Sequence, residues 1–190
     1  VLTSRDLDAL LTGADSSAGV SVSVASAIRM ATVWACVRLL AESIAQLPCH
    51  VYVKNRDGSK TRVTDTALAE MLGQQPNHWQ SPFEYAEFSV TALAMQGNHY
   101  AYKVRNGRGV TEELIPFAPG SVHMKRRGLR DIKFVVSQGG GQETYDLEDI
   151  HHVRGLTFDG FVGVSPITHH RETIGMAEAA NIYGGRLFKN

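Results

Sequence analysis

The chain has 190 residues, and its 19 Lys and Arg are balanced by 19 Asp and Glu, so its formal charge is zero. This balance argues against a strongly cationic nucleic-acid-binding protein and against an acidic tail protein. Two cysteines, Cys36 and Cys49, are too few for a disulfide framework or a four-cysteine zinc site. The longest unbroken apolar stretch, Val33 to Val37, is far too short to cross a bilayer, so we expect no membrane contact.

The two ends of the chain carry their own signals. Residues 1–24 are rich in Ser, Ala, Gly, Thr and Val without periodicity, which predicts a flexible N-terminal arm. Such an arm either has no role or reaches a neighbouring subunit. The chain begins without Met, and a helical pattern runs through Phe188 with no stop signal after it, so we expect a fragment of a longer protein.

A long amphipathic helix is predicted from Ser26 to Leu47, because apolar residues recur along it at helical spacing. Pro48 ends it, since proline lacks a backbone N–H and disfavours helix in the residue before it. Trp34 lies on the apolar face, and if its ring is buried, Trp34→Ala should cost ~3–5 kcal/mol of stability. An unchanged melting temperature would instead place the ring at an exposed interface. Pro48→Ala should be mild.

Two shorter signals follow in the chain. Residues 49–54 and 60–63 alternate like strands around an Asn-Arg-Asp-Gly turn, which predicts a hairpin. Asp65 is a candidate cap for a short helix. Ser81-Pro82-Phe83-Glu84 is a capping box with proline at the first helical position, and it opens a helix that stops at Gly97.

The remainder is mostly β-structure. Short strands are predicted at 99–105, 110–117, 122–126, 132–137, 144–147 and 150–154. Ser165-Pro166 then opens a last helix. Helices and strands are segregated, which predicts an α+β fold with helices packed on mostly antiparallel short strands. The expected organisation is an arm at 1–24, an α+β domain at 25–164 and the start of a long helix at 165–190.

Eight histidines invite a metal hypothesis, so a metal-dependent hydrolase that uses the His151/His152 region is one alternative function. Zinc ligands usually come from motifs with fixed offsets, and the chain has no HExxH, paired CxxC or Asp-rich calcium loop. In the predicted strand, His151 and His152 face opposite sides. On the predicted last helix, His169 and His170 diverge by about 100°. Neither pair chelates by itself, so we expect no metal and no cofactor.

The other candidates for chemistry are Ser165 and a basic cluster. Gly163-Val164-Ser165-Pro166 is not a nucleophile elbow, because the proline has no N–H for an oxyanion hole, and Ser165 is better interpreted as a helix cap. The basic cluster consists of Lys125, Arg126, Arg127, Arg130 and Lys133. It is either a solvated hairpin tip or a contact with DNA phosphates, and a DNA-binding module is therefore the second alternative function. The residues alone indicate an α+β fragment that is not an enzyme.

Several stretches together resemble the HK97-type family of bacteriophage portal proteins, in the family's order and spacing from about residue 25 onward. They are 34–48, 68–72 with Gln75-Pro76-Asn77, 84–88, 96–102, 113–122, 149–155, 159–167 and 186–190. The positions taken as family-motif residues with a structural role are Trp34, Pro48, Pro76, Asn77, Gly97, Asn98, Tyr100, Pro116, His151, Arg154, Gly155, Gly163, Ser165, Pro166 and Phe188.

The resemblance implies a truncated portal wing region, with stem, clip and crown elements and the pore lining after Asn190. It implies a structural subunit of a twelve-membered ring at one capsid vertex of the virion. Double-stranded DNA would pass through the ring without sequence specificity during packaging and ejection. Terminase, capsid and neck or tail proteins are the implied partners, and assembly would occur in the host bacterial cytoplasm. In the family the terminase hydrolyses ATP, so no enzymatic activity is implied here.

Overall fold

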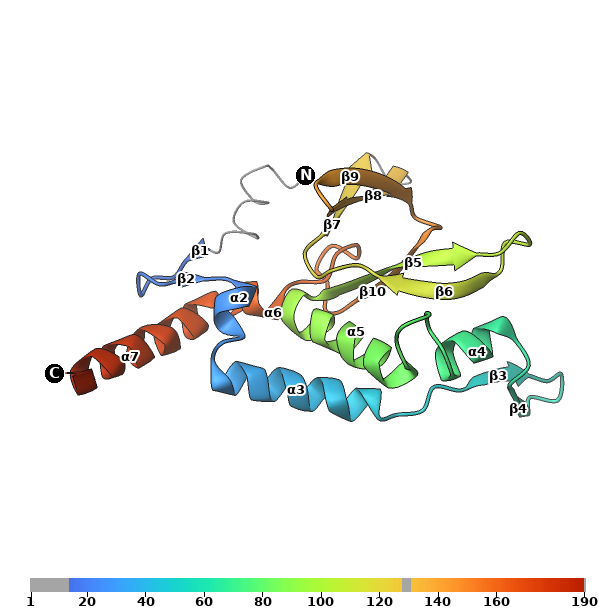
Figure 1. Ribbon diagram of the computed structural model, residues 1–190, viewed down its shortest axis with the longest axis horizontal. Coiled ribbons are helices and arrows are strands. Elements are labelled where there is room, and N and C mark those ends of the chain that lie inside the picture. Colours follow the sequence, from blue (N-terminus) through green and yellow to red (C-terminus); the bar gives the residue numbers. More distant parts are fainter. Residues whose placement is uncertain (1–13, 128–130, 190) are drawn as a thin grey trace. The chain divides into compact units, whose positions relative to one another are not determined.

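Helices and short antiparallel strands alternate in blocks along residues 14–127 and 131–189, the part of the chain that the computed structural model describes (Figure 1). The described residues form two units. The first is built from three separate segments: the residues up to Leu39, Ala92–Asn98, and the residues from Arg154 on. The second consists of Leu40–Thr91 and His99–Val153.

The first unit contains β1 (Ala14–Asp15), β2 (Ser21–Val22), α2 (Val24–Ala27), the start of α3 (Ala31–Ala45), the end of α5 (Pro82–Gln96), α6 (Pro166–His169) and α7 (Arg171–Lys189). Its small core joins Val22, Ala27 and Ile167, which come from β2, α2 and α6. Within the described residues, no helix is both long enough and apolar enough to cross a membrane.

Residues 14–24 differ from the flexible arm that their composition predicts. They form the β1–β2 hairpin and the N-cap of α2, while residues 1–13 of that arm lie outside the described residues. The backbone N–H and the hydroxyl of Ser17 both donate to the Glu172 carboxylate of α7, at 2.9 and 2.7 Å. This partner lies 155 residues away in the chain, so local composition does not reveal it.

The helix predicted at 26–47 is divided in two. Ser23 caps α2 through a capping box with Ser26, and the backbone then tightens, because Arg29 and Met30 donate to carbonyls three residues earlier. The second piece, α3, ends at Ala45. The break therefore separates α2, which belongs to the first unit, from α3, whose residues are divided between the two units.

The second unit contains the rest of α3 and α5, with β3 (Val51–Lys54), β4 (Lys60–Val63), α4 (Ala67–Gly73), β5 (Asn98–Arg105), β6 (Thr111–Pro116), β7 (Val122–Arg127), β8 (Asp131–Gln138), β9 (Gly141–Asp146) and β10 (Ile150–Arg154). β10, β5 and β6 form one three-stranded sheet in that order, β7, β8 and β9 form another, and β3 and β4 form a separate hairpin.

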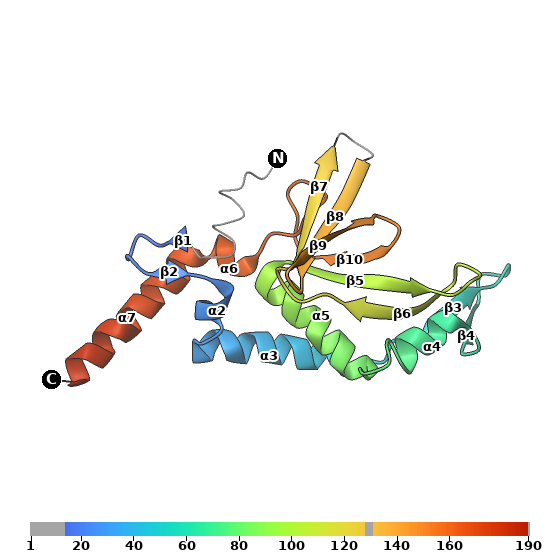
Figure 2. The same cartoon turned by 45° about the horizontal axis from the view of Figure 1, so that its top comes forward.

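The main core of the second unit lies between the two three-stranded sheets (Figure 2). It combines Val122, Phe134 and Val136 from the β7–β8–β9 sheet with Ile150 from β10. On another side of the β5–β6 pair, a smaller cluster around Met71 of α4 packs against these two strands. The α+β fold with antiparallel strands is confirmed.

Several local expectations are met. Ser81 Oγ accepts from the Glu84 N–H at 3.3 Å, and Glu84 accepts from the Ser81 N–H at 2.7 Å, which is the predicted capping box. The cap of α4 is Thr66 and not Asp65, because the Thr66 hydroxyl is the group that reaches the Ala69 N–H.

Candidate functional site

The family-motif glycines meet at one backbone junction in the first unit. Gly97 ends α5 with φ of 74°, a left-handed conformation that side chains disfavour. A Cβ atom on Gly97 would overlap the Val164 carbonyl, and one on Gly163 would overlap the Gly97 carbonyl oxygen. The Gly155 N–H donates to the same Gly97 oxygen at 2.9 Å. Three segments therefore touch through bare backbone, a packing that only glycine permits.

Side-chain hydrogen bonds of Asn98 and Ser165 also stabilise this junction. The Asn98 amide donates to the Gly163 carbonyl at 2.7 Å and accepts from the Gly163 N–H at 2.8 Å. The Ser165 hydroxyl donates to the Met95 carbonyl at 2.8 Å. Ser165 also caps α6, with Pro166 in its first turn, as the sequence predicts. The junction thus fixes the start of α6 against the end of α5.

The loop between β10 and α6 leads into the junction and is stabilised by its own hydrogen bonds. Asp159 accepts from the Phe161 and Val162 N–H groups at 2.8 and 3.0 Å, and these bonds lower the pKa of its carboxyl. Gly160 follows with φ of 77°. The Arg154 guanidinium donates to the Gly160 carbonyl. The bulky loop between β10 and α6 is therefore an ordered turn.

We expect Asn98→Ala to cost about 2–3 kcal/mol, because it leaves the part-buried N–H and C=O of Gly163 without the amide that satisfies both. Urea unfolding followed by circular dichroism measures this. Asn55→Ala, which removes an exposed amide from a hairpin turn, is the matched control and should cost well under half as much. Equal losses would contradict the role of Asn98.

A second motif pair, Pro76 and Asn77, is buried in the second unit. The Pro76 carbonyl accepts from the Leu114 N–H at 2.8 Å, and the Asn77 amide donates to the Leu114 carbonyl at 3.0 Å. The Asn77 side-chain oxygen also accepts from the N–H groups of Trp79 and Gln80. This loop therefore joins β6 almost as an additional strand would.

Tyr100 belongs to the main core of the second unit. Its ring stacks on His152, with centroids 4.3 Å apart, and meets Phe134 edge-on at 5.7 Å. His151 is half-buried on the same strand as His152. Pro116 ends β6, opposite Ala101 of β5. Of these motif residues, Tyr100 helps to pack the two sheets together.

The histidine pairs do not assemble a metal site. His151 and His152 occupy a strand, as predicted, and His152 packs on an aromatic ring. His169 and His170 are not within one helix, because α6 ends at His169 and His170 is its C-cap. Among the described residues, no group of three or more His, Cys, Asp or Glu could hold a metal ion. The hydrolase alternative has no support from this geometry.

The sequence analysis missed His99, a buried histidine that is 1% exposed on β5. Its Nε2 lies 3.2 Å from both the Ser89 hydroxyl and the Tyr85 hydroxyl, which α5 supplies. Burial, and to a lesser extent His151 and His152, lowers the pKa of His99 to about 4. A strand residue flanked by Asn and Tyr gives no local sign of this burial, which depends on the packing of α5.

The stability of the fold should fall as the pH drops below 6.5. An unfolded histidine then binds a proton that folded His99, with its pKa near 4, does not bind. This difference should destabilise the folded state by about 1.5 kcal/mol between pH 6.5 and pH 5. Urea midpoints across this range would show a weaker pH dependence for His99→Gln. Parallel curves for the two proteins would refute the assignment.

The predicted basic cluster is only partly described. Lys125 and Arg126 are exposed on β7, where Lys125 lies directly opposite Lys133 of β8. Arg127 ends β7, and Arg130 lies outside the described residues.

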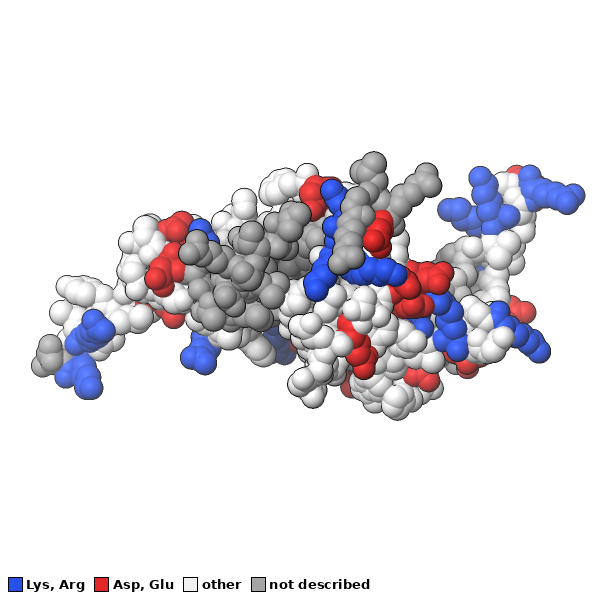
Figure 3. All heavy atoms as spheres, turned by 90° about the horizontal axis from the view of Figure 1, so that it is seen from above, with Lys and Arg blue, Asp and Glu red and all other residues white. Residues whose placement is uncertain are grey.

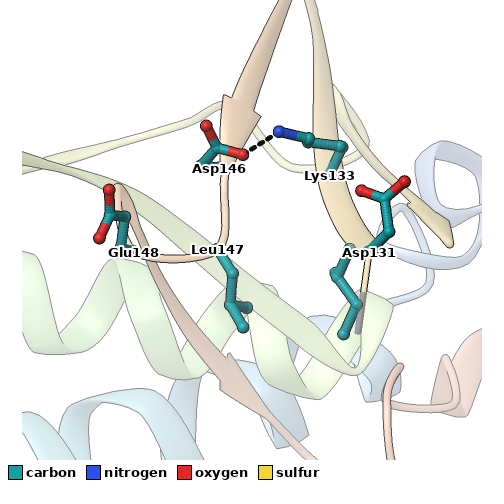
Figure 4. Close-up of a pocket in the computed structure, with 6 residues that line it drawn as sticks. Asp131, Lys133, Asp146, Leu147 and Glu148 are labelled. Carbon is teal, nitrogen blue, oxygen red and sulfur yellow. Dashed lines mark hydrogen bonds and ion pairs between the residues drawn. The ribbon is translucent and has the colours of Figure 1, made fainter. Parts of the chain in front are cut away.

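Two carboxylates, Asp146 and Asp131, lie near Lys133 (Figure 4). Its ammonium pairs with Asp146, and this bond together with the charge of Asp146 raises the pKa of Lys133. Asp131, Leu147 and Glu148 line the same open hollow. A phosphate approaching Lys133 would be repelled by the charges of Asp146 and Asp131, so this part of the cluster does not favour DNA.

Trp34 and Phe188 are solvent-exposed, by 57% and 90%, and Pro48 is exposed as well. The expectation of a buried Trp34 ring is therefore wrong: α3 buries a narrow stripe of Val37, Ala41 and Ala45 instead. Other exposed large apolar residues on α3 and α7 are Leu39, Leu40, Ile44, Met176, Ile182, Tyr183 and Leu187.

The described residues thus form an α+β fold in which the motif residues of the glycine junction, the Pro76–Asn77 loop and Tyr100 make backbone and packing contacts. The family model for phage portal proteins matches residues 31–190. The chain belongs to the phage portal protein family.

Two individual relatives are similar to the chain over long stretches. The chain is 41% identical over 116 residues to Protein BeeE of Escherichia coli K12, covering 60% of this chain and 72% of BeeE. It is 28% identical over 164 residues to the portal protein of Enterobacteria phage HK97, covering 86% of this chain but 38% of that protein. The chain therefore spans well under half of the HK97 protein.

Solved structures share the fold. The neck of an empty gene transfer agent (GTA) particle, with C6 symmetry, matches with a TM-score of 0.72 at 21% identity, covering 88% of this chain and 46% of that chain. An HK97-family portal protein from Corynebacterium diphtheriae matches with a TM-score of 0.63 at 18% identity, covering 87% and 50%.

Proposed function

We propose that this chain is the wing-containing part of a structural subunit of a phage portal ring, through which double-stranded DNA is packaged and ejected. The match to the portal family over residues 31–190 carries the proposal. In this proposal, residues 25–164 are the wing-like domain, and residues 165–190 begin the helix that leads toward the stem. The subunit performs no catalysis.

Ring assembly is supported by the C6 symmetry of the matching GTA neck, which is compatible with twelve subunits. A closed ring uses heterologous interfaces, in which two different patches of each subunit meet. Large apolar side chains exposed on α3 and α7, such as Leu39 and Tyr183, suit that requirement.

The ring would sit at one capsid vertex of the virion after assembly in the host cytoplasm. Terminase, capsid and neck or tail proteins are the partners in this proposal. Zero net charge suits a conduit, because each phosphate contact strengthens DNA binding and would slow its passage.

Electron microscopy of a longer chain, extended past Asn190 along its native gene, tests the proposal. Closed rings with a central channel and twelve-fold symmetry are expected. Particles that remain monomeric across a wide range of salt and protein concentrations would overturn the ring, and the family fold alone would stand.

A further inference from the structure

The β3–β4 hairpin carries a basic face that the sequence analysis did not identify. In its register, Tyr52 lies opposite Arg62, and Lys54 lies opposite Lys60. Side chains alternate between the two faces of a strand, so these four residues share one face. All four are exposed. We call Lys54, Lys60, Arg62 and Tyr52 the basic face, and Figure 3 shows Lys and Arg side chains gathered over this hairpin.

The basic face lacks an anionic partner within the described part of the chain. Lys54 and Lys60 are directly opposed, and like charges in that position destabilise a strand pair. Elsewhere in the second unit, Arg105 and Lys133 pair with Asp149 and Asp146. An anion bound from outside the chain would relieve the repulsion between Lys54 and Lys60.

The hairpin presents this face on an ordered turn. The Asn55 amide donates to the Ser59 and Thr61 hydroxyls at 2.8 and 2.9 Å, and Gly58 has φ of 86°. The Asp57 carboxylate accepts from the N–H and hydroxyl of Ser59, at 2.9 and 2.7 Å, so it serves the turn. The turn therefore fixes the backbone register that places the three cations on one face.

The composition of the basic face favours nucleic acid over protein as the source of the anion. Lysine is depleted in protein–protein interfaces, and two of the three cations here are lysines. Protein–DNA interfaces are more polar and much more positively charged. A two-stranded ribbon also fits the major groove of DNA.

We propose that the basic face binds the phosphate backbone of double-stranded DNA without sequence specificity. The inference rests on the proposed portal function, in which DNA moves past this subunit, and it adds a DNA contact away from the pore lining. Three cations give a weak contact, with an expected salt slope of log K against log salt of about −2.7. Doubling the salt concentration should then weaken binding about sixfold. Such a contact releases quickly, as moving DNA requires.

Fluorescence anisotropy of a labelled 20-base-pair duplex in low salt tests the contact with the chain as it is. We expect Lys54→Gln/Lys60→Gln/Arg62→Gln to weaken binding at least tenfold. Lys125→Gln/Arg126→Gln is the matched control, because it removes exposed cations from β7 and should leave most binding intact. Circular dichroism spectra and melting temperatures verify that both variants fold.

Two results would overturn the inference. One is an absence of duplex binding by the unsubstituted chain at low salt. The other is binding that survives the triple substitution and is lost in the control pair, which would assign DNA to β7.

The ring experiment separates this inference from the portal function. Rings formed by a longer chain that does not bind the duplex would leave the portal function standing and refute the basic face. Duplex binding through the basic face by a chain that forms no rings would support the basic face and refute the ring. Loss of rings in the triple variant, together with no duplex binding, would assign the basic face to a neighbouring subunit.

Discussion

Gly163→Ala should lower the stability of the fold by about 3 kcal/mol, at the upper end of the cost of overpacking. The new methyl group would overlap the carbonyl oxygen of Gly97 and lie 3.0 Å from the Gly155 nitrogen. Backbone atoms cannot turn aside as a flexible side chain does, so the three segments must separate. The melting temperature measured by circular dichroism should fall by about 6–12 °C.

Gly184→Ala is the matched control for this substitution. Gly184 lies inside α7, and a Cβ atom there meets nothing within 4 Å. Because alanine favours helix over glycine, Gly184→Ala should be neutral or stabilise the chain by up to about 1 kcal/mol. A Gly163→Ala protein as stable as the unsubstituted chain would mean that the close junction does not exist in solution.

Phe134→Ala should cost about 3–5 kcal/mol, the range for removing a large aromatic side chain from a core. Phe134 is 0% exposed and joins Val122, Val136 and Ile150 between the two three-stranded sheets. Its ring also meets Tyr100 edge-on, and this contact is lost with it. Urea unfolding measures the loss as a lower midpoint.

Trp34→Ala is the informative comparison, because it removes an even larger ring. That ring is more than half exposed, so the substitution should cost less than about 1 kcal/mol. If Trp34→Ala lowered the free energy of unfolding as much as Phe134→Ala does, the Trp34 ring would have to be buried in solution. Another part of the chain or a second molecule would then cover α3.

Contacts within a few residues could be predicted from the sequence. The Ser81–Glu84 capping box, the Ser165 cap and the hairpin around Gly58 each depend on four to six neighbouring residues, whose chemistry suffices. The alternation of apolar residues also placed most strands. The family resemblance then selected the glycines and Asn98 without giving a reason for them.

Contacts between distant segments could not be predicted in the same way. Asn98 reaches Gly163 across 65 residues, and Ser17 reaches Glu172 across 155. Helical spacing identifies the apolar face of α3 but not whether anything covers it, which is why Trp34 was misplaced. The basic face was overlooked because Lys54 and Lys60 become neighbours only when the hairpin register is known.

The first unit is built from segments that are synthesised at different times. All parts of the second unit have been made once Val153 is added, whereas the first unit still needs the residues from Arg154 on. Since the ribosome delivers the chain from the N-terminus, we expect the β-rich unit to fold first, while the residues up to Leu39 wait for α6 and α7. A chain that ends at Val153 should then still protect the amides around Phe134 from hydrogen exchange. Rapid exchange there would mean that the two units fold together.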